Sequence, residues 1–304
     1  MVETLVADEY FTSPDFPIAI VHVPSRLPVC NMHRHEFAEL AIVFAGKAIH
    51  CTEQASYPIE TGDIFFLRGQ QVHGFRDIEA LDIANLIFRP ERLSIGWHYL
   101  RTLPGYHALF ALEPSYRQQH AFLSRLHVDM EALADIAGLI TQMQEELDRR
   151  DAGYEPIVLA HFSHLLVHLA RCYSRMTTPI AQHVLRVAAA VSYIETNFPQ
   201  AITLRELSDI AFMSPFTFLR VFKQAMGLSP IAYLINTRVR KAVDLLHESS
   251  HGITDIADAV GFTDSNYFAR QFKAIMGISP RAYRQHLGIL REPATASRLL
   301  KKHE

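Results

Sequence analysis

The spacing of hydrophobic residues divides the chain into a strand-like first third and a helical remainder. Short apolar runs lie between residues 18 and 88, separated by turn residues such as Gly46 and Gly62. Runs that recur about every 8–12 residues between turns indicate the strands of a barrel or a sandwich. Pro58 cannot donate a ladder hydrogen bond, so it should lie on an edge strand or at a strand end. The expected strands are 18–23, 40–44, 48–51, 56–59, 64–67 and 81–88.

Apolar residues at helical spacing follow in two segments, 130–147 and 157–176. Asp151 to Gly153 separates the two segments with a break in the pattern. Each segment has an apolar stripe, so the pair should form an antiparallel hairpin. The hairpin could pack on the barrel, on a second subunit, or on both. The stripe of the first segment is Met130, Leu133, Ile136, Ala137, Ile140, Met143 and Leu147.

Residues 203–230 and 253–280 carry one pattern twice. The matching positions are 50 residues apart near the ends of the copies but 49 apart near their starts, where Leu204 matches Ile253, so the second copy has one extra residue in its turn. Thr203 and Glu206 form a capping box, and Ser214 before Pro215 should start the next helix. The repeat predicts two helix-turn-helix units joined by one long helix over 231–247. The matching positions are Arg220 with Arg270, Phe222-Lys223 with Phe272-Lys273, and Met226-Gly227 with Met276-Gly277.

The second helix of each unit has a predicted outward face. Arg220 lies about 200° around the helix from the apolar Phe218 and Phe222, so it should point to solvent. Outward Arg and Asn side chains on a short helix after a tight turn suit guanine and adenine edges in the major groove. The candidate DNA-binding residues are Phe216, Thr217 and Arg220 in the first unit, and Ser265, Asn266 and Arg270 in the second.

Charge is distributed unevenly along the chain. Residues 1–180 hold 14 Lys and Arg against 22 Asp and Glu, whereas residues 181–304 hold 15 against 10. The positive surplus therefore lies in the half that carries the repeat, where a surface facing phosphates needs it. The overall net charge of −3 hides this difference.

Composition excludes several other classes of protein. Hydrophobic residues make up 49% and charged residues 20%, which argues against disorder. The three cysteines, Cys30, Cys51 and Cys172, form no CxxC pair, which excludes a disulfide framework and a cysteine-rich zinc module. The N-terminus lacks a basic segment followed by an apolar core, and no apolar run reaches 18 residues. We expect a soluble, cytoplasmic protein without membrane contact.

The strand-rich region contains a possible metal or ligand set. His33, His35 and Glu39 fall at even spacings, so on one strand their side chains would share a face. With Gly46 they form H-x-H-x3-E-x6-G, which resembles the first motif of the cupin barrels. Together with His73, these residues supply three imidazoles and one carboxylate, a set that could hold a divalent metal ion. Alternatively, His33, His35, Glu39 and His73 bind an organic effector and no metal. The second cupin motif is incomplete, because Arg68 and Gln70 replace its proline and glycine.

Arg89 and Arg92 follow the last expected strand. Paired arginines can grip a carboxylate or phosphate with bidentate hydrogen bonds, so Arg89 is a further candidate effector-binding residue. A sensor for a phosphorylated or dinucleotide signal would use both arginines. The simpler interpretation is a solvated turn that leaves the barrel.

The helical half resembles the AraC/XylS family of bacterial transcription regulators over residues 184–287. The N-terminal region fits that family's cupin-like sensor barrel. The H-x-H-x3-E motif, Gly62-Asp63, His73 and 90–93 (PERL) are similar to the L-rhamnose regulators in particular. One departure is the first reading helix, where Phe216 and Leu219 stand at positions that often hold polar base-contacting residues. The first unit would then read thymine methyl groups and DNA shape. The motifs behind the resemblance are R-x3-A-x2-LL from Arg238, I-x2-IA-x2-VGF from Ile253, and NYF-x3-FK-x3-G-x-SP from Asn266.

The resemblance implies an α+β protein with five parts. These are a cupin-like effector-binding barrel (1–112), a dimerising helical hairpin (113–176), a linker (177–183), a double helix-turn-helix DNA-binding domain (184–287) and a C-terminal tail (288–304). The implied function is a ligand-responsive transcription activator of carbohydrate metabolism, not an enzyme. Its implied partners are double-stranded DNA, a sugar effector, RNA polymerase and a second copy of the chain. The rival hypothesis is a cupin metalloenzyme, an isomerase or dioxygenase, fused to DNA-binding helices.

Overall fold

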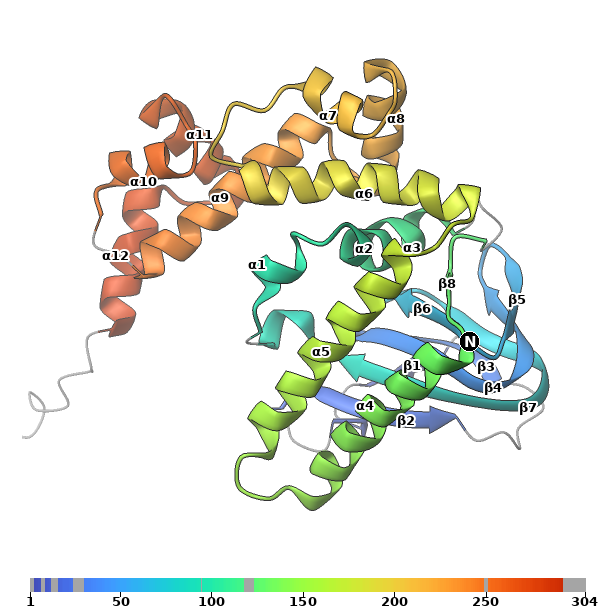
Figure 1. The fold of residues 1–304 in the computed structure, drawn as a ribbon. Coiled ribbons are helices and arrows are strands. Elements are labelled where there is room, and N and C mark those ends of the chain that lie inside the picture. Colours follow the sequence, from blue (N-terminus) through green and yellow to red (C-terminus); the bar gives the residue numbers. More distant parts are fainter. Residues whose placement is uncertain are drawn as a thin grey trace, which may run out of the picture.

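An eight-stranded sheet, curved into a barrel, forms the N-terminal half (Figure 1). The computed structural model describes residues 3–6, 9–11, 16–23, 30–93, 95–117, 123–248 and 251–291. The hydrogen-bonded path is β1-β3-β7-β4-β6-β8, with β2 on β7 and β5 on β4. The strands are β1 (Glu3–Leu5), β2 (Ile18–Val23), β3 (Cys30–His35), β4 (Ala38–Thr52), β5 (Ser56–Glu60), β6 (Asp63–Leu67), β7 (His73–Phe88) and β8 (Leu126–His127).

Two predicted strand ends were wrong. Segments 40–44 and 48–51 belong to the single strand β4, and β7 starts at His73 rather than at 81. Gly46 bends β4 instead of ending it. Its φ is +80°, and a Cβ there would lie 2.3 Å from the carbonyl oxygen of Ala80 on β7, so only glycine allows the two strands to stay paired through the bend. Pro58 lies in β5, which pairs with β4 alone among the described strands, as predicted for an edge.

Alternation along the strands separates two cores. Ala41, Val43 and Phe65 face the barrel interior, whereas Leu40, Ile42 and Phe66 belong to a second core outside it. The strands read as continuous apolar runs because both faces are buried. The outer face of the sheet is covered by helices, which places helical side chains against the back of the barrel.

Helices follow the barrel in three groups (Figure 1). Short helices α1 (Trp97–Leu100), α2 (Pro104–His107), the π-helical turn η3 (Ala108–Leu112) and α3 (Glu113–Tyr116) lie beside the sheet, after the 3-10 turn η2 (Pro90–Arg92). The hairpin is α4 (Met130–Arg149) and α5 (Tyr154–Ser174). The remaining helices are α6 (Pro179–Asn197), α7 (Leu204–Ile210), α8 (Pro215–Met226), α9 (Pro230–Glu248), α10 (Ile253–Ala259), α11 (Ser265–Met276) and α12 (Pro280–Arg291).

Three boundaries between the expected parts differ from the sequence interpretation. The predicted linker 177–183 is helical from Pro179, because Thr178 caps α6 by accepting from the backbone N–H of Ala181. The segment expected to hold only the hairpin also supplies β8, which pairs with β6. Asp63 fixes this strand through ion pairs of 2.8 Å with Arg125 and His127. Of the expected tail, residues 288–291 are the end of α12, and 292–304 lie outside the described residues.

The doubled pattern folds as two helix-turn-helix units. Helices α7 and α10 have seven residues each and α8 and α11 have twelve, while the second turn is one residue longer. In the shared M-G-x-S-P segment one helix ends and the next one begins. Gly227 and Gly277 end their helices with φ of +74° and +79°, and Ser229 and Ser279 cap the next ones. The repeat and the capping box at Thr203 are confirmed.

The two units are attached differently to the rest of the molecule. Phe218 and Phe222 of the first unit belong to the same core as the outer face of the barrel. The hydroxyl of Tyr116 on α3 donates to the carbonyl oxygen of Val221 on α8 at 3.1 Å. The second unit has a separate core that includes Phe268 and Phe272. The first unit is therefore docked on the sensor domain, and the second is held by α9.

Candidate functional site

Three of the four candidate barrel residues converge in the interior. Glu39 of β4 lies 3.0 Å from Nε2 of His35 and 3.7 Å from Nε2 of His73, measured from Oε2. All three are buried, and their ligand atoms lie within 4.8 Å of one another. His33 is paired in register with His73 and its ring centroid lies 4.4 Å away, but it stands outside this group of three.

The backbone fixes how these histidines can be protonated. Nδ1 of His35 lies 2.8 Å from the carbonyl oxygen of Phe37, and Nδ1 of His73 lies 3.1 Å from that of Gln71. Each Nδ1 must therefore carry the hydrogen, and in the neutral ring Nε2 offers only a lone pair. Two such lone pairs then face the carboxylate oxygen of Glu39, which is a third acceptor. Acceptors that converge in a buried site need a cation between them, either a proton or a metal ion.

The charge state of the group follows from its burial. Burial lowers the pKa of His73 to about 4, despite the opposing effect of Glu39, so this ring is neutral at pH 7. Burial alone would raise the pKa of Glu39, but the contact with His35 and the nearby histidines hold it below its ordinary value. A neutral imidazole with its second nitrogen on a backbone carbonyl is the usual form of a metal-bound histidine.

The donor set fits a divalent metal ion. Two imidazole nitrogens and one carboxylate match both the His₂Glu zinc set and the two-histidine, one-carboxylate iron set. His35, Glu39 and His73 would hold the ion. When bound, it would supply positive charge and open coordination positions for oxygen ligands. Of the four candidate metal ligands, His33 alone lies outside this group of three. It would therefore stand beside the ligands and not bind the ion itself.

A small cavity of about 150 Å³ adjoins this group, and its wall contains a residue that the sequence interpretation missed. His33 and Glu39 line it together with Tyr10, Phe37 and Asn85. Oε1 of Glu39 and Oδ1 of Asn85 are buried and accept no hydrogen bond from the described residues. Asn85 stands two residues from the inward Ile83 on β7, and this spacing was the available signal for it.

The arginines after the last strand lie elsewhere. The guanidinium of Arg89 stacks over the ring of Phe11 at 5.1 Å, and Arg89 is not in the wall of the barrel cavity. Arg92 is exposed at the end of η2. Phe11 itself packs edge-on against Phe37, which does line the cavity. Arg89 is thus separated from the cavity by two aromatic rings.

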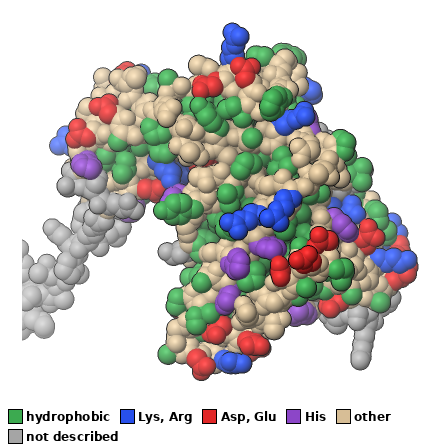
Figure 2. Space-filling view, viewed as in Figure 1, with side chains coloured by type: hydrophobic (Ala, Val, Ile, Leu, Met, Phe, Trp, Pro, Cys, Tyr) green, Lys and Arg blue, Asp and Glu red, His purple; other side chains and the backbone are tan. Residues whose placement is uncertain are grey.

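The first reading helix presents an apolar surface with one arginine. Phe216 of α8 is 79% exposed and Phe212, in the turn before it, is 78% exposed. Thr217 is half-buried because its hydroxyl bonds to that of Ser214, while Arg220 is exposed. Figure 2 shows hydrophobic side chains at the surface over α7 and α8, interspersed with charged side chains of both signs. Large exposed aromatic side chains are costly in water, so this patch indicates a contact surface.

The turn before that helix is strained. Phe212 has φ of +53°, a left-handed conformation that L-residues adopt at a cost of about 1–2 kcal/mol. The matching position in the second unit is Gly261, with φ of +90°. The Phe212 ring is covered on one side by the guanidinium of Arg186, 5.8 Å away. A phenylalanine retained in a glycine position, with its ring exposed, supports a role for that ring in binding.

The second reading helix is polar. Asn266 and Arg270 of α11 are exposed on one face, while Phe268 and Phe272 are fully buried behind them. Ser265 is half-buried at the helix start, where Asp264 caps the helix by accepting from the backbone N–H of Asn266. The guanidinium of Arg270 lies 5.9 Å from the Tyr267 ring, which extends the arginine away from the core.

Two basic residues of α9 turn inward instead of adding to this surface. Arg238 donates to the carbonyl oxygens of Phe198 and Gln200, at 2.7 Å each, and so caps the end of α6. Arg240 pairs with buried Glu195 at 2.7 Å. Part of the positive surplus of this half is therefore structural.

Comparison with known proteins relates both halves to one family. The AraC-like ligand binding domain matches residues 18–162, and a helix-turn-helix domain matches residues 207–286. The HTH-type transcriptional activator RhaS of Citrobacter koseri is 30% identical over 264 residues, which are 86% of this chain and 89% of the relative. The chain belongs to the AraC family of transcription regulators. It combines a ligand-binding barrel with a DNA-binding helix-turn-helix domain.

Two further similar proteins are a second curated relative and a solved domain. The HTH-type transcriptional activator RhaR of Mannheimia succiniciproducens is 25% identical over 260 residues, covering 86% of this chain and 88% of its own. A solved DNA-binding domain of AdpA, in complex with a target DNA, is 31% identical, with a TM-score of 0.33; it covers 35% of this chain and 96% of its own.

Within the part of the chain that the structure describes, no helix is long and apolar enough to cross a membrane.

Proposed function

We propose that this AraC-family regulator is a sugar-responsive activator that reads its operator with α8 and α11. The observation that carries the proposal is the pair of exposed reading faces, Phe216 with Arg220 and Asn266 with Arg270, each backed by a buried pair of phenylalanines. Helix α9 joins the units, so both faces can engage successive major grooves, roughly 34 Å apart. Relatives that cover most of the chain are transcriptional activators, which supports activation rather than catalysis.

A gel-shift experiment tests the reading faces. Binding sites would first be selected from random DNA with the wild-type protein. Arg270→Ala and Asn266→Ala should each weaken binding to the selected site by about 1–3 kcal/mol and weaken binding to random DNA much less. Arg76→Ala, at an exposed arginine of β7, is the matched control and should change neither. Equal losses on selected and random DNA would show that α11 contacts only the DNA backbone.

The barrel cavity supports a sugar as the effector. Two buried acceptors, Oε1 of Glu39 and Oδ1 of Asn85, face it without a donor from the described residues, and sugar hydroxyls are donors. The rings of Phe37 and Phe75 supply apolar walls against which a sugar ring can stack. The cavity of about 150 Å³ suits a monosaccharide better than a larger ligand.

The resemblance to the L-rhamnose regulators makes L-rhamnose the first sugar to test, by titration calorimetry beside a panel of other monosaccharides. Asn85→Leu and Glu39→Gln should each reduce sugar affinity at least about tenfold, because each removes one buried acceptor. Glu36→Gln, at an exposed carboxylate three residues from Glu39, is the matched control. Unchanged affinity in Asn85→Leu would move the effector out of this cavity.

Metal binding is tested separately by elemental analysis of the purified protein. We expect one divalent ion per chain in the wild type and in His33→Gln, and less than about a tenth of that in His73→Gln, because the loss of one of three ligands leaves too few. Stoichiometric metal together with turnover of a substrate would favour the metalloenzyme hypothesis. Sugar binding that survives removal of the ion would assign the three residues to the effector alone.

We further propose that the regulator acts as a homodimer and contacts RNA polymerase, as expected for an activator. The outer face of the α4–α5 hairpin is the proposed dimer surface, since its inner stripe is already buried on the molecule's own core. Gly138 lies on this outer face, and a Cβ added there would meet no atom within 4 Å, so Gly138→Arg should fold normally and yield a monomer by light scattering. A persisting dimer would exclude this face.

A further inference from the structure

A larger cavity lies outside the barrel, on the far side of the sheet from the proposed effector site. It has a volume of about 430 Å³, nearly three times that of the barrel cavity. We call it the aromatic chamber. Its walls are Phe66 and Phe88 from the outer face of the sheet, Trp97, Tyr106 and Phe110 from the short helices, and Leu166 from α5.

The rings in this chamber form a connected set. Phe110 packs edge-on against Phe66 with centroids 5.2 Å apart, and lies 5.1 Å from Tyr106. The polar groups among the lining residues are few: the side chains of Glu91 and Arg101 and the hydroxyl of Tyr106. A sugar would need donors and acceptors along the walls, so this chamber instead suits an apolar or aromatic body with a polar group at one end.

A second cavity of about 480 Å³ shares Leu93, Trp97 and Arg101 with the aromatic chamber. We call it the basic chamber. It is lined by three cations, Arg101, Arg240 and Lys241. Arg240 is already paired with Glu195, and Lys241 lies 4.0 Å from Asp244. The basic chamber thus extends the aromatic chamber from the barrel to α9 of the DNA-binding domain.

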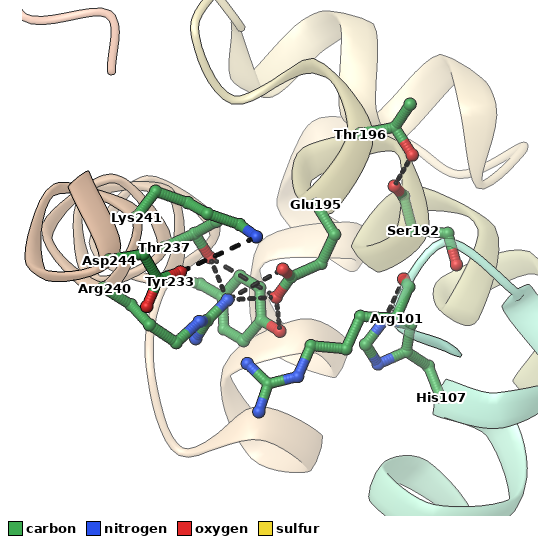
Figure 3. A network of polar contacts seen from close by, with 10 residues as sticks. All are labelled: Arg101, His107, Ser192, Glu195, Thr196, Tyr233, Thr237, Arg240, Lys241 and Asp244. Carbon is green, nitrogen blue, oxygen red and sulfur yellow. Dashed lines mark hydrogen bonds and ion pairs between the residues drawn. The ribbon is translucent and has the colours of Figure 1, made fainter. Parts of the chain in front are cut away.

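Arg101 stands where the two chambers meet, and its guanidinium is available to a ligand. Figure 3 shows its side chain extending from the end of α1 toward the network around Glu195, with no dashed line at its guanidinium. Its backbone carbonyl accepts from His107 at 2.7 Å, but the guanidinium makes no hydrogen bond or ion pair with any described residue. The Arg101 guanidinium is half-buried, and a guanidinium can donate two parallel hydrogen bonds to one carboxylate.

We propose that the joined chambers bind a small amphiphilic carboxylate, with its apolar body among the aromatic rings and its carboxylate on Arg101. Glu91 lines the same chamber, so a singly charged head is favoured over a phosphate dianion. The site is independent of the barrel cavity, because the sheet separates them. A ligand there lies between the sensor domain and α9, the helix that joins the two reading units.

Trp97 makes the site directly observable. It is the only tryptophan in the chain and lines both chambers, so intrinsic fluorescence reports their occupancy. The probe is 4-phenylbutyrate, compared with neutral 4-phenylbutanamide of the same shape. We expect a saturable change of Trp97 emission with the carboxylate and at least about tenfold weaker binding of the amide, because the charged hydrogen bonds are lost.

Three variants locate the probe. Arg101→Gln should weaken 4-phenylbutyrate binding at least about tenfold, and Arg101→Lys should weaken it less. Glu39→Gln, in the barrel, should leave it unchanged, as should the control Arg171→Gln at an exposed arginine of α5. Melting curves of each variant check that the protein is folded, which is expected because the Arg101 guanidinium makes no hydrogen bond or ion pair with a described residue.

Several results would overturn the proposal: no saturable change, equal binding of the acid and the amide, or unchanged affinity in both Arg101 variants. Loss of 4-phenylbutyrate binding in Glu39→Gln would also do so, since the probe would then occupy the barrel. The sugar titration fails or succeeds separately, because L-rhamnose binding should be the same in Arg101→Gln and in the wild type.

Discussion

The joint between α6 and α9 depends on one buried carboxylate, and its removal has a calculable effect. The Glu195 side chain is 2% exposed and accepts from Nη2 of Arg240 at 2.7 Å and from the hydroxyl of Tyr233 at 2.7 Å, as Figure 3 shows. Burial alone would raise the pKa of Glu195, but Arg240 and Tyr233 hold it below its ordinary value. The group is therefore an anion, held by donors from the opposite helix.

Glu195→Gln keeps the shape and removes the charge. Breaking a fully buried ion pair costs about 3–5 kcal/mol, but the Arg240 side chain is 37% exposed and can regain part of its hydration. The loss of one hydrogen-bond acceptor for Tyr233 adds about 1 kcal/mol. We therefore expect the free energy of unfolding of the full chain to fall by about 2–3 kcal/mol, measured by urea denaturation followed by circular dichroism.

The matched control is Glu79→Gln. Lys47 and Glu79 form an ion pair of 2.9 Å, close to the 2.7 Å between Arg240 and Glu195, but their side chains are 63% and 65% exposed. Exposed pairs contribute roughly 0–1 kcal/mol, so this change should cost less than about 0.5 kcal/mol. If Glu195→Gln cost no more than Glu79→Gln, the joint would be held by the apolar contacts of α6 and α9 alone, and the electrostatic reasoning would be wrong.

Two further predictions concern the helices beside the sheet. Burial lowers the pKa of His107 to about 4, so between pH 6.5 and 4 the unfolded chain takes up a proton that the folded chain does not. Stability should therefore fall on acidification by up to roughly 3 kcal/mol from this residue, and denaturation at a series of pH values should show a shallower fall in His107→Gln. Gly105→Ala should cost at least about 3 kcal/mol, because its Cβ would lie 1.8 Å from the carbonyl oxygen of Ala170 and force α2 from α5. Thermal denaturation of the Gly105→Ala variant measures this loss. The comparison variant is Gly138→Ala, which has open space around its Cβ and should stabilise α4 by about 0.5–1 kcal/mol.

The sequence predicted most fully those features that depend on neighbours along the chain. The helix caps at Thr203 and Ser214 and the one-residue difference between the two turns are local, and all were predicted. The expectation that His33, His35 and Glu39 lie on one strand was only partly right. His33 and His35 share β3, but a bend at residues 36–37 separates them from Glu39, which lies on β4. His35 and Glu39 therefore meet inside the barrel through the course of the chain and not through alternation on one strand.

Features that depend on distant segments could not be predicted. The even spacing of Asn85 from Ile83 could place its side chain in the barrel, but that it lies beside Glu39 follows from the pairing of β7 with β4, which no local pattern specifies. The strand end expected at Gly46 was wrong because a glycine can bend a paired strand as well as end it. Net charge could not predict that Arg240 forms an ion pair with a buried carboxylate, since its partner Glu195 lies 45 residues away.

The different attachment of the two reading units bears on how an effector can influence DNA binding. The first unit shares a core with the outer face of the barrel, and α8 packs on η3 and on α3, where the hydroxyl of Tyr116 bonds to the carbonyl of Val221. A shift of the sheet can therefore reach α8 through these short helices. The second unit has its own core and packs on α9, which in turn packs on α6. The distance between the two reading faces is therefore set by α9 and by the joint at Glu195. A ligand that binds two conformations of this joint unequally shifts their populations by its difference in affinity, and the spacing of the operator half-sites selects between them.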